Sequence, residues 1–213
     1  MIKIRPKNVL EQEDGFPDEI TFYMPSPIAV GTLTVIEQIV LLKLMRLSDP
    51  GFIFEFGTYK GMTTRLLLAN LPPKKPDIKE PRIYTLDLDS VDGVRFQATD
   101  SILANESHGY LFLYLNHPNS SDVKQLLQDC LTLDENLYIE KFDFIFIDGN
   151  HELSYVMSDT EKSFKMVKRN GGYIVWHDYG NPQFPELTKY IDELSLTQDI
   201  YHVGDTMLAY CKL

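Results

Sequence analysis

The feature that most constrains the fold is an alternation of short apolar segments with helical patterns along most of the chain. Five segments rich in aromatic and β-branched residues are typical of buried strands. They span residues 52–56, 82–87, 110–115, 142–148 and 173–178. Helical patterns lie between these segments and before the first one, where the pattern begins with a capping box at Thr34 and Glu37. Strands that alternate with helices predict a parallel sheet with helices on both faces.

Two more strands are expected at the end of the chain, at residues 199–203 and 206–213, joined by a Gly-Asp turn. A further helix is expected over residues 121–131, because its apolar residues recur at helical spacing. The predicted fold is therefore α/β, with a Rossmann-like doubly wound sheet of seven strands that is mostly parallel and closes on a C-terminal β-hairpin.

The composition limits the classes of partner. The chain has 213 residues and a formal net charge of −11, so its surface repels nucleic acids and anionic membranes. Its two cysteines form no metal-ligand spacing, and no apolar run has the roughly 18 residues of a membrane helix. We expect a cytoplasmic protein with a small-molecule substrate.

The chain is predicted to consist of an N-terminal arm and one domain. Residues 1–30 contain four prolines and several acidic residues, and we expect an irregular N-terminal arm there. The arm is open to two interpretations, a simple tail or a lid over a substrate pocket. Residues 31–213 are predicted to form a single domain.

A glycine turn follows the first expected strand. Glu55 ends that strand, Gly57 and Gly61 follow, and a helical pattern begins at Met62. Glycines let the backbone approach a ligand, and the helix amides face it. The spacing differs from the pattern that binds a pyrophosphate, and Glu55 favours a positively charged ligand such as S-adenosylmethionine (SAM). An ordinary strand-to-helix turn remains the alternative.

Acidic residues end four of the expected strands. Glu55, Asp87, Asp148 and Asp178 would therefore meet at one edge of the sheet, where such folds bind ligands. Asp87 is placed to accept the hydroxyls of a ribose, with Asp89 as the second choice. The alternative for Asp87 is a surface carboxylate at a strand end.

Two neighbouring strand ends carry groups that could bind a metal. Asp148, His177 and Asp178 would supply part of the shell of Mg²⁺ or Mn²⁺, and His177 favours Mn²⁺. The alternative is a hydrogen bond between His177 and Asp178 or the backbone, without metal. His151 follows Asp148 by three positions and is a candidate general base, or a helix cap.

Four motifs resemble one known family. They are Glu-Phe-Gly-Thr-Tyr-Lys-Gly-Met-Thr, Tyr-Thr-Leu-Asp, Phe-Ile-Asp-Gly-Asn-His and Trp-His-Asp-Tyr, beginning at residues 55, 84, 146 and 176. From residue 31 onward the chain resembles class I SAM-dependent methyltransferases, in particular the catechol and macrocin-type O-methyltransferases. The resemblance implies that the cofactor is held by Glu55, Gly57, Tyr59, Gly61, Thr63, Asp87 and, for the adenine, Ser120 or Ser121.

The same resemblance implies a metal site at Asp148, His177 and Asp178 and a catalytic base at His151. Two positions depart from the family pattern: His177 replaces an acid, which leaves the metal open, and His151 replaces a lysine. The expected function is methylation of a small-molecule hydroxyl with SAM and a divalent cation. The alternatives are a SAM-binding module without catalysis and an NAD(P)-dependent oxidoreductase. A homodimer is common for such folds, although no segment defines an interface.

Overall fold

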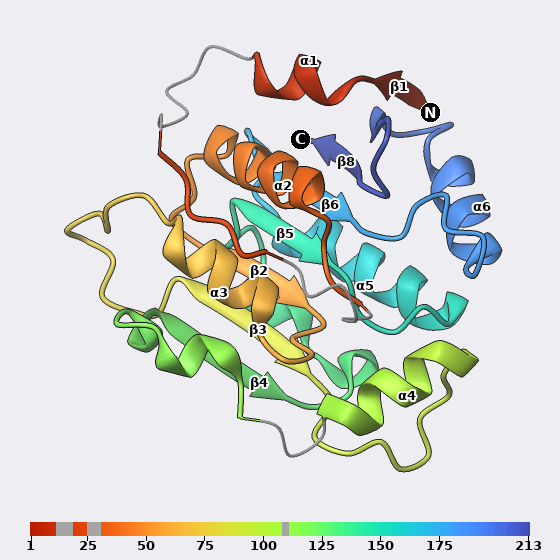
Figure 1. The fold of residues 1–213 in the computed structure, drawn as a ribbon, viewed down its shortest axis with the longest axis horizontal. Helices are drawn as coiled ribbons and strands as arrows, with labels where there is room; N and C mark the ends of the chain where they lie inside the picture. The colour runs from red at the N-terminus through yellow and green to blue at the C-terminus, as the bar shows by residue number, and fades with distance from the viewer. Residues whose placement is uncertain (12–18, 25–30, 108–110) are drawn as a thin grey trace.

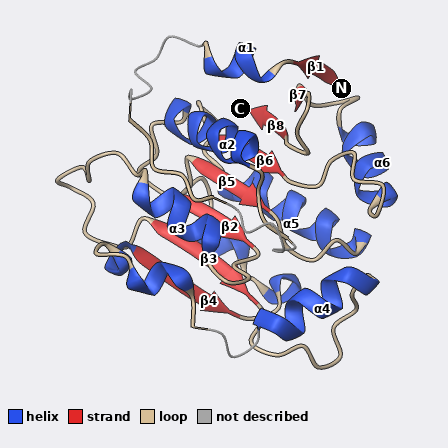
Figure 2. Ribbon diagram, in the orientation of Figure 1, coloured by secondary structure: helices blue, strands red, loops and turns tan. Residues whose placement is uncertain are grey.

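The computed structural model describes residues 1–11, 19–24, 31–107 and 111–213 and contains one eight-stranded sheet between two layers of helices (Figures 1 and 2). The strands are β1 (Ile2–Ile4), β2 (Ile53–Phe56), β3 (Ile83–Asp87), β4 (Val123–Leu127), β5 (Phe144–Ile147), β6 (Tyr173–Trp176), β7 (Ile200–Val203) and β8 (Ala209–Lys212). Their spatial order is β1-β7-β8-β6-β5-β2-β3-β4. β8 is antiparallel to β6 and β7, and the other neighbouring pairs are parallel. The predicted doubly wound α/β fold is confirmed.

The helices cover both faces of the sheet. They are α1 (Pro6–Leu10), α2 (Val35–Leu47), α3 (Met62–Ala69), α4 (Ala98–Ser107), α5 (Leu153–Met166) and α6 (Pro185–Leu194). Ile53 packs into a core with α2 and α3, whereas Phe54 faces a second core with α5 and α6. Burial on both faces explains why the central strands are continuously apolar. In the described part of the chain, no helix is long and apolar enough to span a membrane.

The order in which successive strands are added to the sheet switches from one side of β2 to the other. It runs from β2 to β3 and β4 on one side and then returns to β5 and β6 on the other. Ligands of open α/β sheets bind beyond the C-terminal strand ends at such a reversal. In Figure 1 these ends point toward α4, which lies past them. The amide of Asp148 donates to the carbonyl of Phe56 at 3.0 Å, so the segments that follow β2 and β5 are held together.

The third predicted strand and the helix after it were wrong. Residues 113–116 form a single 3-10 turn, and β4 occupies residues 123–127, where a helix was expected. β4 is an edge strand paired with β3, with Val123 beside Ile83. An edge strand needs only one apolar face, so a short edge-strand sequence also fits helical spacing. What makes this segment a strand is backbone pairing with β3, which leaves no pattern in the amino-acid sequence. Tyr114 packs instead into the core of α2 and α3.

The N-terminal arm is more regular than expected. Residues 2–4 form β1 on the edge of β7, which makes the sheet eight-stranded rather than seven-stranded, and α1 follows. Three residues are too few to show a strand pattern. Residues 21–24 dock on the domain, as the amides of Thr21 and Tyr23 donate to the side chains of Asn70 and Gln38. The lid interpretation falls largely on residues 12–18 and 25–30, which lie outside the described residues.

Candidate active site

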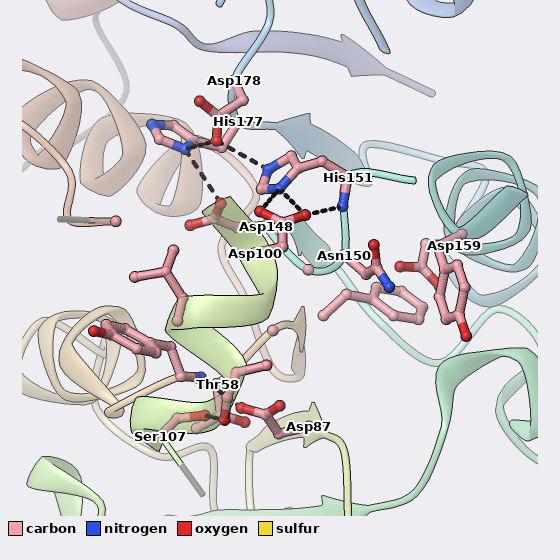
Figure 3. A pocket seen from close by; sticks show the side chains of 18 of the residues that line it. Thr58, Asp87, Asp100, Ser107, Asp148, Asn150, His151, Asp159, His177 and Asp178 are labelled. Carbon is pink, nitrogen blue, oxygen red and sulfur yellow. Dashed lines mark hydrogen bonds and ion pairs between the residues drawn. The ribbon is translucent and has the colours of Figure 1, made fainter. Parts of the chain in front are cut away.

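A cavity of about 300 Å³ opens at the C-terminal ends of β2, β3, β5 and β6 (Figure 3). Its walls are the segments that follow these strands, together with residues of α4 and α5. Asp87, Asp148 and Asp178 all line it, as their positions at strand ends predicted. The sheet edge that the sequence identified is therefore the edge with the cavity.

In the glycine turn after β2, the backbone lies too close to neighbouring atoms to leave room for a side chain. Gly57 has a φ of +88°, and a Cβ there would lie 2.0 Å from the carbonyl oxygen of Asp148. Gly61 caps α3 with a φ of +76°, and its Cβ would lie 2.9 Å from the Tyr114 ring. Gly57, Tyr59 and Thr63 line the cavity, whereas Gly61 is not among its described lining residues. Gly61 therefore shapes the turn.

Glu55 lies outside the cavity wall, contrary to the sequence-based prediction. Its Oε2 accepts hydrogen bonds from Thr64 at 2.5 Å and Thr85 at 2.6 Å, beneath α3, and its side chain is completely buried. The alternation of β2 turns this residue toward the helix, while the cavity begins past the strand end. Burial raises the pKa of Glu55 to about 8, so the carboxyl group is largely protonated at neutral pH. It supports the turn from below.

Asp87 is held in place by the backbone. Its Oδ2 accepts a hydrogen bond from the amide of Tyr59 at 2.6 Å, and its Oδ1 accepts one from Leu88 at 2.8 Å. Burial raises the pKa of the carboxyl group. Tyr59 has a φ of +48°, a left-handed conformation that this contact helps to hold. Asp89 is not among the described lining residues.

The acid–histidine cluster at the other end comprises Asp148, His177 and Asp178, with His151 and Asp100 joined to it. His177 Nδ1 lies 3.2 Å from Asp148 Oδ1 and 3.0 Å from Asp178 Oδ2. One donor atom from each of Asp148, His177 and Asp178 lies within 4.8 Å of the others. Two carboxylates and an imidazole are suitable ligands for a divalent ion, so these residues fit the predicted metal site.

His151 is enclosed by carboxylates. Its Nδ1 lies 3.0 Å from both Asp100 oxygens, its Nε2 lies 3.0 Å from Asp178 Oδ2, and its ring stacks on Phe184. Burial lowers the pKa of His151, but Asp100 and Asp178 outweigh it and raise the pKa to about 10. The ring carries a proton at neutral pH, and both nitrogens are engaged. This geometry favours a residue that holds Asp178 over a free base.

Two residues of this end were missed from the sequence. Asp100 lies on α4, whose pattern is weak, and nothing in its surroundings marks it. Glu37 was recognised only as the acid of a capping box, yet its Oε1 also accepts the amide of Met207 and lies 3.7 Å from His177 Nε2. Both contacts join segments far apart in sequence, so only the tertiary structure brings them together.

Ser121, predicted for the adenine, lies at the wrong end of the sheet. Ser120 and Ser121 belong to a 3-10 turn that leads into β4, so they precede the strand they were expected to follow. Neither is among the described residues that line the cavity. The error follows from the misplaced third strand. Cys130, three positions past the end of β4, lines the cavity instead.

Solved structures share the fold. SAH-bound methyltransferase PaMTH1 of Podospora anserina has a TM-score of 0.60 at 14% identity, covering 85% of this chain and 79% of that chain. The Bacillus cereus O-methyltransferase in complex with SAH has a TM-score of 0.57 at 16% identity, with coverages of 87% and 83%. TomG of Streptomyces achromogenes, an O-methyltransferase solved with SAM, has a TM-score of 0.54 at 15% identity, with coverages of 84% and 79%.

At these identities the likeness establishes the fold alone. No curated protein sequence matches the chain. A family model described as a methyltransferase domain matches residues 54–179, which is more than half of the chain. The matched region runs from the glycine turn through Asp87 and Asp148 to Asp178. The chain therefore belongs to the methyltransferase domain family.

Proposed function

We propose that this protein is a SAM-dependent O-methyltransferase that acts on a hydroxyl of a small molecule and uses a divalent cation. The observation that carries the proposal is one cavity that joins the glycine turn and Asp87 at one end to the acid–histidine cluster at the other. A cofactor held at the first end would direct its reactive group toward the second. The proposal agrees with the family and with the ligands named for the solved structures of the same fold.

The residues of the first end fit the cofactor. Asp87 has carboxylate lone pairs for the ribose hydroxyls, and its orientation is set by two backbone amides. Gly57 brings the backbone to the cavity wall, and Tyr59 and Thr63 line the expected site of the methionine part. When bound, SAM supplies a methyl group whose bond to sulfur breaks as the bond to the substrate oxygen forms, leaving S-adenosylhomocysteine (SAH).

The residues of the second end fit a cation. Asp148, His177 and Asp178 would hold it, and Asp178 is oriented by Asn181 Nδ2 at 2.5 Å and by His151. The carboxylates suit Mg²⁺, and the imidazole shifts the preference toward Mn²⁺. Such a cation would lower the pKa of the substrate hydroxyl and fix the position of its oxygen.

The hydroxyl proton must leave as the oxygen attacks. His151 as the acceptor stays a prediction, because its nitrogens contact Asp100 and Asp178. What the geometry supports is orientation: His151 joins α4 to Asp178 across the cavity. Alignment of two bound reactants accounts for roughly 7–11 kcal/mol of barrier reduction in well-oriented systems.

Calorimetric titration tests the proposal. SAM and SAH are titrated into the protein with Mg²⁺, with Mn²⁺ and with excess chelator, and SAH formation is followed over a panel of catechols, sugars and other small hydroxyl compounds. We expect micromolar cofactor binding and SAH formation that stops in chelator. Absence of SAM and SAH binding under every condition would refute the cofactor, and full turnover in chelator would refute the cation.

A further inference from the structure

One buried carboxylate in the cavity has no role in the site described so far. Asp159 lies on α5 and lines the cavity, although only 1% of the residue is exposed. Figure 3 shows it on the side of α5, with no interaction drawn to another residue of the view. It lies in none of the motifs that indicated the function.

The hydrogen bonding of Asp159 is incomplete. Its Oδ1 is buried and has no hydrogen-bond partner among the described residues. The nearby Lys162 ammonium donates to the backbone carbonyl of Cys130. Burial raises the pKa of Asp159 to about 7, although the Cys130 thiol and the Lys162 ammonium act in the opposite direction. A buried acceptor without a donor is destabilising, and a ligand with an N–H would relieve it.

The surroundings of Asp159 fit a flat, mostly apolar group. Cys130 and Tyr155 line the cavity close to Asp159, and Leu88 lines the same cavity. Gly149 contributes bare backbone, and a Cβ there would lie 3.5 Å from Asp159 Oδ2. Apolar walls with one convergent polar atom are the usual construction of a small-molecule site.

Position along the cavity identifies the group. Asp87 pairs with Leu127 at the end of β4, and Cys130, three positions later, contacts Asp159. A ribose at Asp87 would therefore place its base within reach of Asp159. We propose that Asp159 accepts a hydrogen bond from the exocyclic amine of the cofactor's adenine, the role that the sequence had assigned to Ser121. This inference rests on the proposed function. We call the part of the cavity from Asp87 to Asp159 the nucleoside end.

The assignment predicts discrimination between 6-amino and 6-oxo purines. When Asp159 is ionised, an amine at position 6 donates to it, whereas a carbonyl there would face it acceptor to acceptor and leave it without a donor. Asparagine has nearly the same shape but offers both a donor and an acceptor, so Asp159→Asn can accommodate either purine.

The experiment compares SAH with S-inosylhomocysteine, its 6-oxo analogue, by calorimetric titration of wild-type protein, Asp159→Asn and Asp159→Leu at about pH 8.5, above the Asp159 pKa of about 7. Glu161→Gln is the control, because it makes the same charge change at an exposed position of α5. We expect wild type and Glu161→Gln to prefer SAH by about tenfold or more, Asp159→Asn to lose most of that preference, and Asp159→Leu to bind SAH about tenfold more weakly.

Each outcome decides the inference. Equal affinity of the wild type for both ligands would overturn it, and this arm does not depend on any variant folding. So would an Asp159→Asn protein that keeps the full preference for SAH. If the wild type binds neither SAM nor SAH, the proposed function fails and the inference fails with it. SAH binding with unchanged selectivity in Asp159→Asn refutes Asp159 alone.

Discussion

The two ends of the cavity hold their charged groups in different ways. In the acid–histidine cluster, Asp100, His151, Asp178, His177 and Asp148 form a continuous chain of contacts of 3.0–3.2 Å. At the nucleoside end, Asp87 is bonded by backbone amides, and Asp159 Oδ1 has no partner among the described residues. One end is fixed by its own side chains, whereas the other leaves acceptors for a ligand.

Variants at the two ends should therefore behave differently. Because the side chains of the cluster orient one another, loss of one of them should weaken cation binding and lower turnover together. Separate acceptors contribute to cofactor affinity one at a time. Variants of the cluster should therefore lower turnover and metal binding, and variants of the nucleoside end should lower cofactor affinity.

The largest effect is expected at Asp148. Asp148→Asn removes one carboxylate from the set that would hold the cation, so we expect SAH formation to fall about 100-fold or more and Mn²⁺ binding to be lost. SAH affinity should stay within about threefold. Titration with Mn²⁺ and with SAH separates the two effects, and Asp92→Asn, at an exposed position, is the control. Unchanged Mn²⁺ binding would show that Asp148 is not a ligand of the cation.

His151 and its partner Asp100 give the next effect. If His151 orients Asp178, then His151→Ala and Asp100→Asn should each weaken Mn²⁺ binding and lower SAH formation by about 10- to 100-fold. A base would give a different result, a loss of about 10²- to 10⁴-fold in turnover for His151→Ala with Mn²⁺ affinity retained. Mn²⁺ titration of both variants decides between them, and loss of SAH binding in His151→Ala would contradict both roles.

A smaller effect is expected at Asp87. Asp87→Asn keeps the shape but loses the charge-assisted hydrogen bonds to a ribose, so SAH affinity should fall roughly tenfold. Mn²⁺ binding should not change, since the cluster lies at the other end. Asp89→Asn serves as the matched control, because Asp89 is not among the described lining residues. Equal losses in both variants would argue against a specific contact at Asp87.

The smallest effect on binding is expected at Glu55, which tests its position outside the cavity. Glu55→Gln should change SAH affinity by less than about threefold, whereas a larger loss would restore the ligand contact predicted from the sequence. The variant should alter the pH dependence of stability. The folded pKa of about 8 exceeds the ordinary glutamate pKa of 4.5, so the folded state keeps a proton that the unfolded state releases.

Wild-type stability should therefore fall as pH rises from about 4.5 to about 8, by an amount on the order of 5 kcal/mol from this group. Glutamine retains an acceptor for Thr64 and Thr85 and does not ionise, so Glu55→Gln should not show this decrease. Urea unfolding at pH 5 and pH 8 measures the difference between the two proteins. Parallel pH profiles for wild type and variant would contradict the raised pKa.

The centre of the sheet was predictable because its strands are buried on both faces. β5 and β6 are continuous apolar segments that Asp148 and His177 follow directly, and β2 is interrupted only by Glu55. The pairing of β5 with β6 places Asp148 near Asp178. β4 and β1 lie at the edges, where strand formation depends on a neighbour's backbone. Because β4 lies later in the chain than the predicted strand, Ser121 precedes β4, and the residues that follow the strand are at its other end.

The contacts of the site were harder to predict than its residues. Asp148, His177 and Asp178 were recognisable by position, but the partners of His151 were not, because Asp100 comes from a helix with no distinctive pattern. Glu55 was predicted to hold the cofactor, yet its side chain points toward α3, where Thr64 donates to it. Asp159 is the seventh residue of α5, and a single acidic residue in a helix is usually interpreted as a surface residue.

The pairing of β1 with β7 bears on how the molecule avoids association with its own copies. An uncovered sheet edge offers unpaired amides and carbonyls to any neighbouring chain. Residues 2–4 occupy that side, while the opposite edge, β4, carries an exposed lysine at Lys124. The sheet therefore ends on a three-residue strand at one edge and on a strand with an exposed charge at the other. Removing the first few residues would leave β7 as an unpaired edge and a template for aggregation.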